Sequence, residues 1–189
     1  MEHVQLDSRA LRVLAHPLRA RLLSELRRSG AATATHLAAQ LTTNTGATSY
    51  HLRKLAEVGL VTETGEGTGK QRFWAAAQES HGWSDASVVG DPDAEAASGW
   101  LRQHYWSHFS EKVARWEDER PRWPVEWRDA ASSSDALVTA TPEELTELMT
   151  TLESELARFK ERVGDEPRPG ARQVAVQLYS MPTDPTDRP

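Results

Sequence analysis

The stretch from Thr35 to Val61 restricts the fold of this chain more than any other part of the sequence. Apolar residues and one threonine recur there with helical spacing in two series, Leu37, Ala38 and Leu41, and then Thr48, Leu52, Leu55 and Val58. Asn44 is suited to begin the second helix, because its side chain can accept from backbone N–H groups of the first turn. Gly59 can end it without a Cβ penalty. The pattern predicts two short helices joined by a tight break, and then a strand.

The other face of the second helix is small, polar or cationic. Its residues are Thr45, Gly46, Ser49, Tyr50 and Arg53, and we expect Asn44 and Lys54 to contact DNA together with them. Short side chains allow a helix to lie in a DNA major groove, hydroxyl groups reach base edges, and Arg53 can pair with a phosphate or a guanine. An ordinary solvated helix face has a similar composition, and for this helix taken alone it is the better interpretation.

The longer string SYHLRKLAEVGLV, residues 49–61, resembles the recognition helix and wing entry of winged-helix repressors of the ArsR/SmtB type. The string LAHPLRARLLSELRRSG, residues 14–30, resembles the same family, whose members often open with a histidine–proline step. We expect Asp7 or Ser8 to cap a first helix, Pro17 to start the second, Gly30 to end it and Thr33 to cap the third. The resemblance covers roughly residues 11–76. It implies a winged helix–turn–helix that binds inverted-repeat DNA as a homodimer.

Two strands are predicted after the recognition helix, at residues 60–64 and 71–76, joined by the glycine-rich string GEGTGK. We interpret this hairpin as the wing, with Lys70 and Arg72 reaching a minor groove or flanking phosphates. The alternative is a flexible hairpin tip that contacts nothing. A nucleotide-binding loop is disfavoured, because no helix with a Lys-Ser/Thr pair follows.

The turn departs from the family pattern. Thr42 stands where glycine is common, and Thr43 and Thr48 stand where aliphatic residues are usual. Gly46 costs about 1 kcal/mol of helix propensity relative to alanine. We therefore expect a less tightly packed helix–turn–helix.

Charge is divided unevenly along the 189 residues, whose net charge is −6. Residues 1–75 contain ten Lys/Arg and six Asp/Glu, a net charge of +4, whereas residues 76–189 contain twelve and twenty-two, a net charge of −10. A locally basic module on an acidic body is compatible with DNA binding, because attraction to phosphates is screened within about 10 Å. The chain has no cysteine, no long apolar run and no signal-peptide pattern, so we expect a cytoplasmic protein without a membrane partner.

The second half is predicted to be mostly helical. We divide the chain into a winged helix–turn–helix domain at 1–77, a linker at 78–92, a helical dimerisation and effector region at 93–180, and a disordered tail at 181–189. One long helix should run from Asp91 to about Glu119, and prolines interrupt the helix after it. A capping box at Thr141 opens another helix, whose apolar seam has a heptad spacing: Leu145, Met149, Leu152, Leu156, Phe159 and Val163. That seam has two candidate partners, its copy in a second subunit or the long helix of its own chain. Short strands at 136–140 and 172–179 complete the prediction as a possible two-stranded element.

Six of the seven tryptophans lie beyond residue 80. Aromatic residues on the long helix, Trp100, Tyr105, Trp106, Phe109 and Trp116, suit either a core and dimer interface or an apolar pocket for a small-molecule effector. His104, His108 and Glu111 have a spacing that zinc sites use, but the cysteine motif and the aspartate-x-histidine of the metal-sensing relatives are absent. We therefore predict no metal and no cofactor. His51 is expected to pack against the wing or to contact the DNA backbone.

No nucleophile elbow or zinc-hydrolase motif occurs, which argues against an enzyme. The prediction is a mainly α winged helix–turn–helix protein with a small β wing that regulates transcription, as a repressor, by binding double-stranded DNA as a dimer. Two alternatives stay open: a protein-interaction module with a degenerate winged helix, and a small-molecule-binding C-terminal domain with an accessory winged helix.

Overall fold

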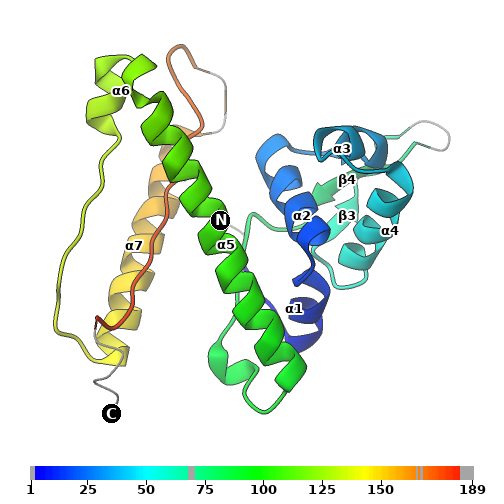
Figure 1. Ribbon diagram of the computed structural model, residues 1–189, viewed down its shortest axis with the longest axis horizontal. Coiled ribbons are helices and arrows are strands. Elements are labelled where there is room, and N and C mark those ends of the chain that lie inside the picture. The colour runs from blue at the N-terminus through cyan, green and yellow to red at the C-terminus, as the bar shows by residue number, and fades with distance from the viewer. Residues whose placement is uncertain (1–2, 68–70, 165, 167, 184–189) are drawn as a thin grey trace. The chain divides into compact units, whose positions relative to one another are not determined.

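Figure 1 shows the computed structural model, which describes residues 3–67, 71–164, 166 and 168–183. The chain forms two compact units, an N-terminal unit of residues 1–110 and a C-terminal unit of residues 111–189, and the division falls within helix α5. None of the helices in the described ranges is long and apolar enough to cross a membrane.

Helices dominate the N-terminal unit, and short strands connect them. In chain order its elements are β1 (His3–Gln5), α1 (Ser8–Leu14), α2 (Pro17–Ser29), β2 (Ala32–Thr33), α3 (Ala34–Gln40), α4 (Thr45–Ala56), β3 (Val61–Glu63), β4 (Phe73–Ala76), β5 (Ser80–Gly82), the 3₁₀ turn η1 (Asp85–Ser87) and α5 (Pro92–Glu119). The predicted helix–turn–helix corresponds to α3 and α4, so the fold class inferred from the sequence is confirmed.

Local capping explains where these helices begin. The side chains of Asp7, Thr33 and Asn44 accept from the backbone N–H three residues on, at 2.7, 3.2 and 2.8 Å. His16 caps α2 through Nδ1, which accepts from the N–H of Leu18 at 3.1 Å, and Pro17 follows at the first helical position. The predicted helix starts are therefore confirmed.

The wing is an antiparallel hairpin of β3 and β4 with Val61 opposite Ala76 and Glu63 opposite Trp74. Its strands are shorter than the predicted ranges, and the predicted contact residue Lys70 lies outside the described residues. β2 adds a third strand that the sequence did not predict, pairing Ala32 with Trp74.

Leucines from α1, α2, α3, α4 and the first half of α5, together with Leu60 just before β3, form the core. Ten of them are at most 2% exposed: Leu11, Leu14, Leu22, Leu23, Leu26, Leu37, Leu52, Leu55, Leu60 and Leu101. The helix–turn–helix is thus held from its inner side by the same core that holds the rest of the unit.

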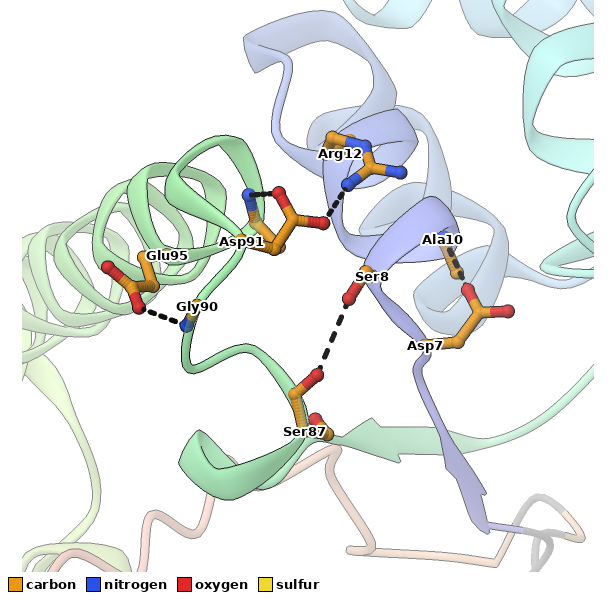
Figure 2. Close-up of polar contacts among 9 residues, drawn as sticks. Asp7, Ser8, Ala10, Arg12, Ser87, Gly90, Asp91 and Glu95 are labelled. Carbon is orange, nitrogen blue, oxygen red and sulfur yellow. Dashed lines mark hydrogen bonds and ion pairs between the residues drawn. The ribbon is translucent and has the colours of Figure 1, made fainter.

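Residues 78–92 are not the linker that their mixed polar composition indicated. β5 pairs in parallel with β1, with Val4 opposite His81, and Val88 is buried in the core. Polar contacts also tie this segment to α1, as Figure 2 shows: the Ser8 hydroxyl donates to the carbonyl of Ser87 at 3.4 Å, and Arg12 pairs with Asp91 at 2.5 Å. The linker prediction failed because a partner strand 77 residues away in the chain cannot be recognised from local composition.

The C-terminal unit contains the end of α5, a 3₁₀ turn (Arg120–Arg122), α6 (Val125–Ala130) and α7 (Pro142–Val163). The predicted capping box is confirmed: Glu144 N–H donates to Thr141 Oγ1 at 3.2 Å, and Thr141 N–H donates to the Glu144 carboxylate at 2.7 Å.

The predicted strands at 136–140 and 172–179 are absent from the described residues, so that part of the prediction was wrong. Their large apolar side chains are mostly exposed, including Leu137 at 85% and Val174 at 61%. Alternation of apolar and polar residues favours a strand only where a buried face exists to receive one side, and these segments have none. Most of the predicted tail, residues 184–189, lies outside the described residues.

Candidate nucleic-acid interface

Helix α4 has one buried face and one exposed face. Thr48, Leu52 and Leu55 are fully buried, whereas Thr45, Gly46, Tyr50 and Arg53 are exposed, and Ser49 and Lys54 are half-buried. The residues of α4 that are predicted to contact DNA therefore share the outer side of this helix. Because the inner side is fixed in the core, the outer side is presented rigidly, as insertion into a groove requires.

The turn before α4 is made without glycine. Thr42 adopts a left-handed conformation with φ of 52°, which a β-branched residue rarely takes. The N–H of Thr43 donates to the carbonyl of Ala38 at 2.9 Å, and Arg21 donates to the carbonyl of Leu41 at 3.2 Å. The backbone of the turn is thus well bonded even though Thr42 is strained.

Thr48 does not loosen the packing as its polarity suggested. Its side chain is fully buried, and its hydroxyl donates to the carbonyl of Asn44 at 3.0 Å. A satisfied hydroxyl avoids the cost of a buried unpaired polar group. The expected loose packing is therefore not found at this position.

Three described cations belong to the predicted interface, and they differ in their partners. Arg53 donates through Nε to the carbonyl of Ser49 at 3.2 Å, and forms no ion pair within the described part of the chain. Lys54 Nζ lies 2.9 Å from both carboxylate oxygens of Glu57, and Arg72 lies 2.7 Å from Glu63 across the wing. Arg53 can bind a phosphate without giving up an ion pair. Lys54 and Arg72 can bind one only if they leave, or share, the carboxylates of Glu57 and Glu63.

Sequence reasoning missed a cluster beside α4, formed by His16, Arg19, Tyr50 and His51. The His51 ring lies 4.4 Å from the His16 ring and 5.1 Å from the Tyr50 ring, measured between centroids. His51 thus packs on the start of α2 and not on the wing, whereas the other expectation, a contact with the DNA backbone, stays a prediction. The sequence feature that could have indicated this cluster is the histidine–proline step at His16, followed by a helix turn that carries Arg19.

Both histidines in this cluster resist protonation. Burial lowers the pKa of His16, and the charge of Arg19 lowers it further. Burial also lowers the pKa of His51, with further contributions from His16 and Arg19. The cluster therefore favours neutral imidazoles next to one fixed guanidinium charge.

The aromatic residues predicted as core or pocket have separate surroundings. Tyr105 bonds His81 at 2.9 Å, and His81 in turn lies 2.5 Å from Arg27, which also donates to the carbonyl of Gln78. Burial raises the pKa of Tyr105 to about 12, although Arg27 opposes the shift. Trp100 stacks on His104 with centroids 4.8 Å apart.

The remaining three aromatic side chains lie elsewhere. Trp106 is 52% exposed with Phe109 at 6.3 Å, and Trp116 contacts Trp123 at 5.6 Å in the C-terminal unit. A tyrosine in a core needs a hydrogen-bond partner for its hydroxyl, and Tyr105 has one in His81. This supports the core interpretation at that position.

His104 and His108 lie one turn apart, with their rings parallel and 6.5 Å between centroids. Among the described residues, no three His, Asp or Glu side chains gather in a group that could hold a metal ion.

The comparison with protein families agrees with the helix–turn–helix described above. A family model described as a helix-turn-helix domain matches residues 14–64. Among solved structures, a possible transcriptional regulator for arsenical resistance is 32% identical, covering 58% of this chain and 96% of that one, with a TM-score of 0.33.

Two mutant structures of Lactococcus lactis ZitR are also similar, one of them in apo form. The apo double mutant is 13% identical, over 75% of this chain and 83% of that one, with a TM-score of 0.34. The single mutant is 14% identical, over 74% of each chain, with a TM-score of 0.34. At such TM-scores the superpositions carry no structural argument, so the likeness rests on the family model and on the 32% identity. No match was found among curated proteins.

Proposed function

Because this chain belongs to the ArsR/SmtB-like family of winged helix–turn–helix, DNA-binding transcriptional regulators, we propose that it represses transcription as a dimer bound to an inverted-repeat operator. The observation that carries the proposal is the outer face of α4, which gathers hydroxyls and cations while the inner face is locked in the core. Two such helices in a dimer would enter successive major grooves about 34 Å apart or at a multiple of that spacing.

Each outer residue of α4 has a proposed role. Thr45, Ser49 and Tyr50 read base edges, because hydroxyl groups both donate and accept. Arg53 and Lys54 bind phosphates, which fix the register of the helix without reading sequence. Gly46 keeps the helix close to the bases: a Cβ there would meet only the Asn44 side chain, at 3.4 Å, so the protein itself has room for alanine.

The wing contributes a second contact. Arg72 on the hairpin side facing Glu63 can grip the phosphates that flank the half-site, and Lys70 is proposed to do the same. When Arg72 binds a phosphate, its ion pair with Glu63 is broken or weakened. The cost is small, because an exposed ion pair is worth at most about 1 kcal/mol.

Binding to labelled DNA from the protein's own upstream region, measured across a salt series, tests the proposal. Arg53→Ala should weaken binding about tenfold and lower the salt slope by about one, because one phosphate contact is lost. Arg115→Ala is the matched control: it removes an exposed arginine from the C-terminal unit, and should leave both quantities unchanged.

Ser49→Ala should reduce affinity for the operator but not for unrelated DNA, because a base contact carries sequence information. A well-folded protein that binds no DNA at low salt would contradict the proposal and favour the protein-interaction alternative.

A further inference from the structure

Helix α7 has an apolar face with the period of a coiled coil. Six residues follow one another at alternating gaps of four and three, with Leu145, Leu152 and Phe159 at d positions and Met149, Leu156 and Val163 at a positions. A period of 3.5 residues keeps one seam against a partner helix along its whole length. At 22 residues the helix is about 33 Å long, which is enough for three heptads.

The described residues cover this seam only in part: Leu145, Met149, Leu156 and Val163 are half-buried, whereas Leu152 and Phe159 are exposed. No residue of α7 is buried, Leu152 is 41% exposed and Phe159 is 52% exposed, and the hydrophobic core of the protein contains no α7 side chain. The Arg162 guanidinium lies 5.1 Å from the centroid of the Phe159 ring. An apolar stripe of this regularity that stays partly exposed indicates a macromolecular partner.

We propose that α7 pairs with α7 of a second copy of this chain, as a parallel two-stranded coiled coil. The inference rests on the proposed dimeric function, and it identifies the surface through which the two copies associate. Leucine at two of the three d positions and valine at one a position is a composition that favours two parallel strands.

The charges beside the seam select the parallel orientation. In a parallel pair each g residue faces the e residue five positions further on in the other helix, which places Glu155 opposite Lys160 twice. In an antiparallel pair whose two helices overlap along their whole length, Glu155 of one helix faces Glu155 of the other. Glu153 likewise faces Glu153. Four carboxylates would then repel across one interface, so opposite charges meet only in the parallel arrangement.

The mass of the intact protein without DNA, measured by sedimentation, is the first test. We expect a dimer for the wild type and, for Leu152→Glu, a dimer dissociation constant raised about 100-fold or more, because a charge is placed in the seam. Thr151→Glu adds the same charge one position earlier, outside the seam, and should leave the dimer intact. Circular dichroism shows whether α7 stays helical in both variants.

A wild-type monomer, or a Leu152→Glu protein that stays dimeric, would overturn the proposal. The second outcome would mean that the seam is covered by its own chain or that another surface makes the dimer. Neither outcome bears on the Arg53→Ala result, so failure here is distinguishable from failure of the DNA-binding proposal.

The orientation is tested by cross-linking, for which the chain is suited because it contains no cysteine. Leu145→Cys should form a disulfide-linked dimer under mild oxidation, because d positions of parallel helices face each other. In the antiparallel pair the two sulfur atoms would lie about 27 Å apart and could not react. A dimer that fails to cross-link would overturn the parallel orientation.

Charge reversal gives an independent check. Glu155→Lys and Lys160→Glu should each weaken the dimer roughly two- to fivefold at low salt, and the double variant should restore it. Absence of restoration, with each single variant as weak as the double, would contradict the assigned pairing.

Discussion

The two units of this protein use their apolar residues differently. In the N-terminal unit, leucines of four helices and of the first half of α5 are almost completely buried, and the helices begin at residues whose side chains cap them. In the C-terminal unit α7 is equally well capped, yet none of its side chains is fully buried, and two of its six seam residues are exposed. A helix can therefore be fully specified by its own sequence and still lack a partner, because capping acts locally whereas burial requires a second surface.

The largest expected difference between the units concerns one pair of leucines. Leu52→Ala should lower the free energy of unfolding by about 3 kcal/mol, since Leu52 is fully buried in the core. Leu137→Ala makes the same chemical change at a side chain that is 85% exposed, and should alter stability by less than about 0.5 kcal/mol. Urea unfolding of both variants measures the contrast. Equal losses would mean that Leu137 is buried in solution and that the C-terminal unit has a core.

The sequence was a good guide to the N-terminal unit because its signals are local. Apolar spacing, capping residues and the stop at Gly59, whose φ is 70°, each act within a few residues, and each predicted helix formed. Identification of the outer face of α4 followed from the same periodicity, because the residues that enter the core define the residues that do not.

Failures of prediction share a physical cause. Strand β5 pairs with β1 across the length of the unit, and His51 packs on His16, 35 residues earlier. Periodicity does not indicate which distant segment will be the partner. The same limit explains the wrongly predicted strands at 136–140 and 172–179. Apolar and polar residues do alternate there, but no surface among the described residues packs against the apolar side.

A smaller effect is expected at Thr42, where local sequence and tertiary structure disagree. Its left-handed φ of 52° costs a β-branched residue roughly 1–2 kcal/mol, whereas glycine adopts it freely. Thr42→Gly should therefore raise the free energy of unfolding by about 1 kcal/mol, after the added freedom of the unfolded chain is subtracted. Chemical denaturation again provides the measurement.

Thr43→Gly is the matched control, since Thr43 does not have a positive φ. It gains flexibility without relief of strain, so it should be neutral or destabilising. If both glycine variants were destabilised alike, the strain at Thr42 would not exist in solution, and the turn would resemble the unstrained loops of the C-terminal unit.

The smallest expected effect is a pH dependence of stability that arises in the N-terminal unit. Burial and Arg19 lower the pKa of His16, and burial, His16 and Arg19 lower that of His51. The native state then binds fewer protons than the unfolded state, in which the imidazole pKa is about 6.5, so stability rises with pH in this window. The stabilisation is fully present above pH 6.5 and is lost as the pH falls through the lowered native pKa values.

Urea midpoints measured at pH 7.5 and 5.5 give this slope directly. His51→Gln should flatten it, because glutamine removes the titrating group while keeping a polar side chain of similar reach beside His16. His36→Gln, at an exposed position on α3, should retain the slope. A slope unchanged in His51→Gln would place the pH dependence outside the cluster.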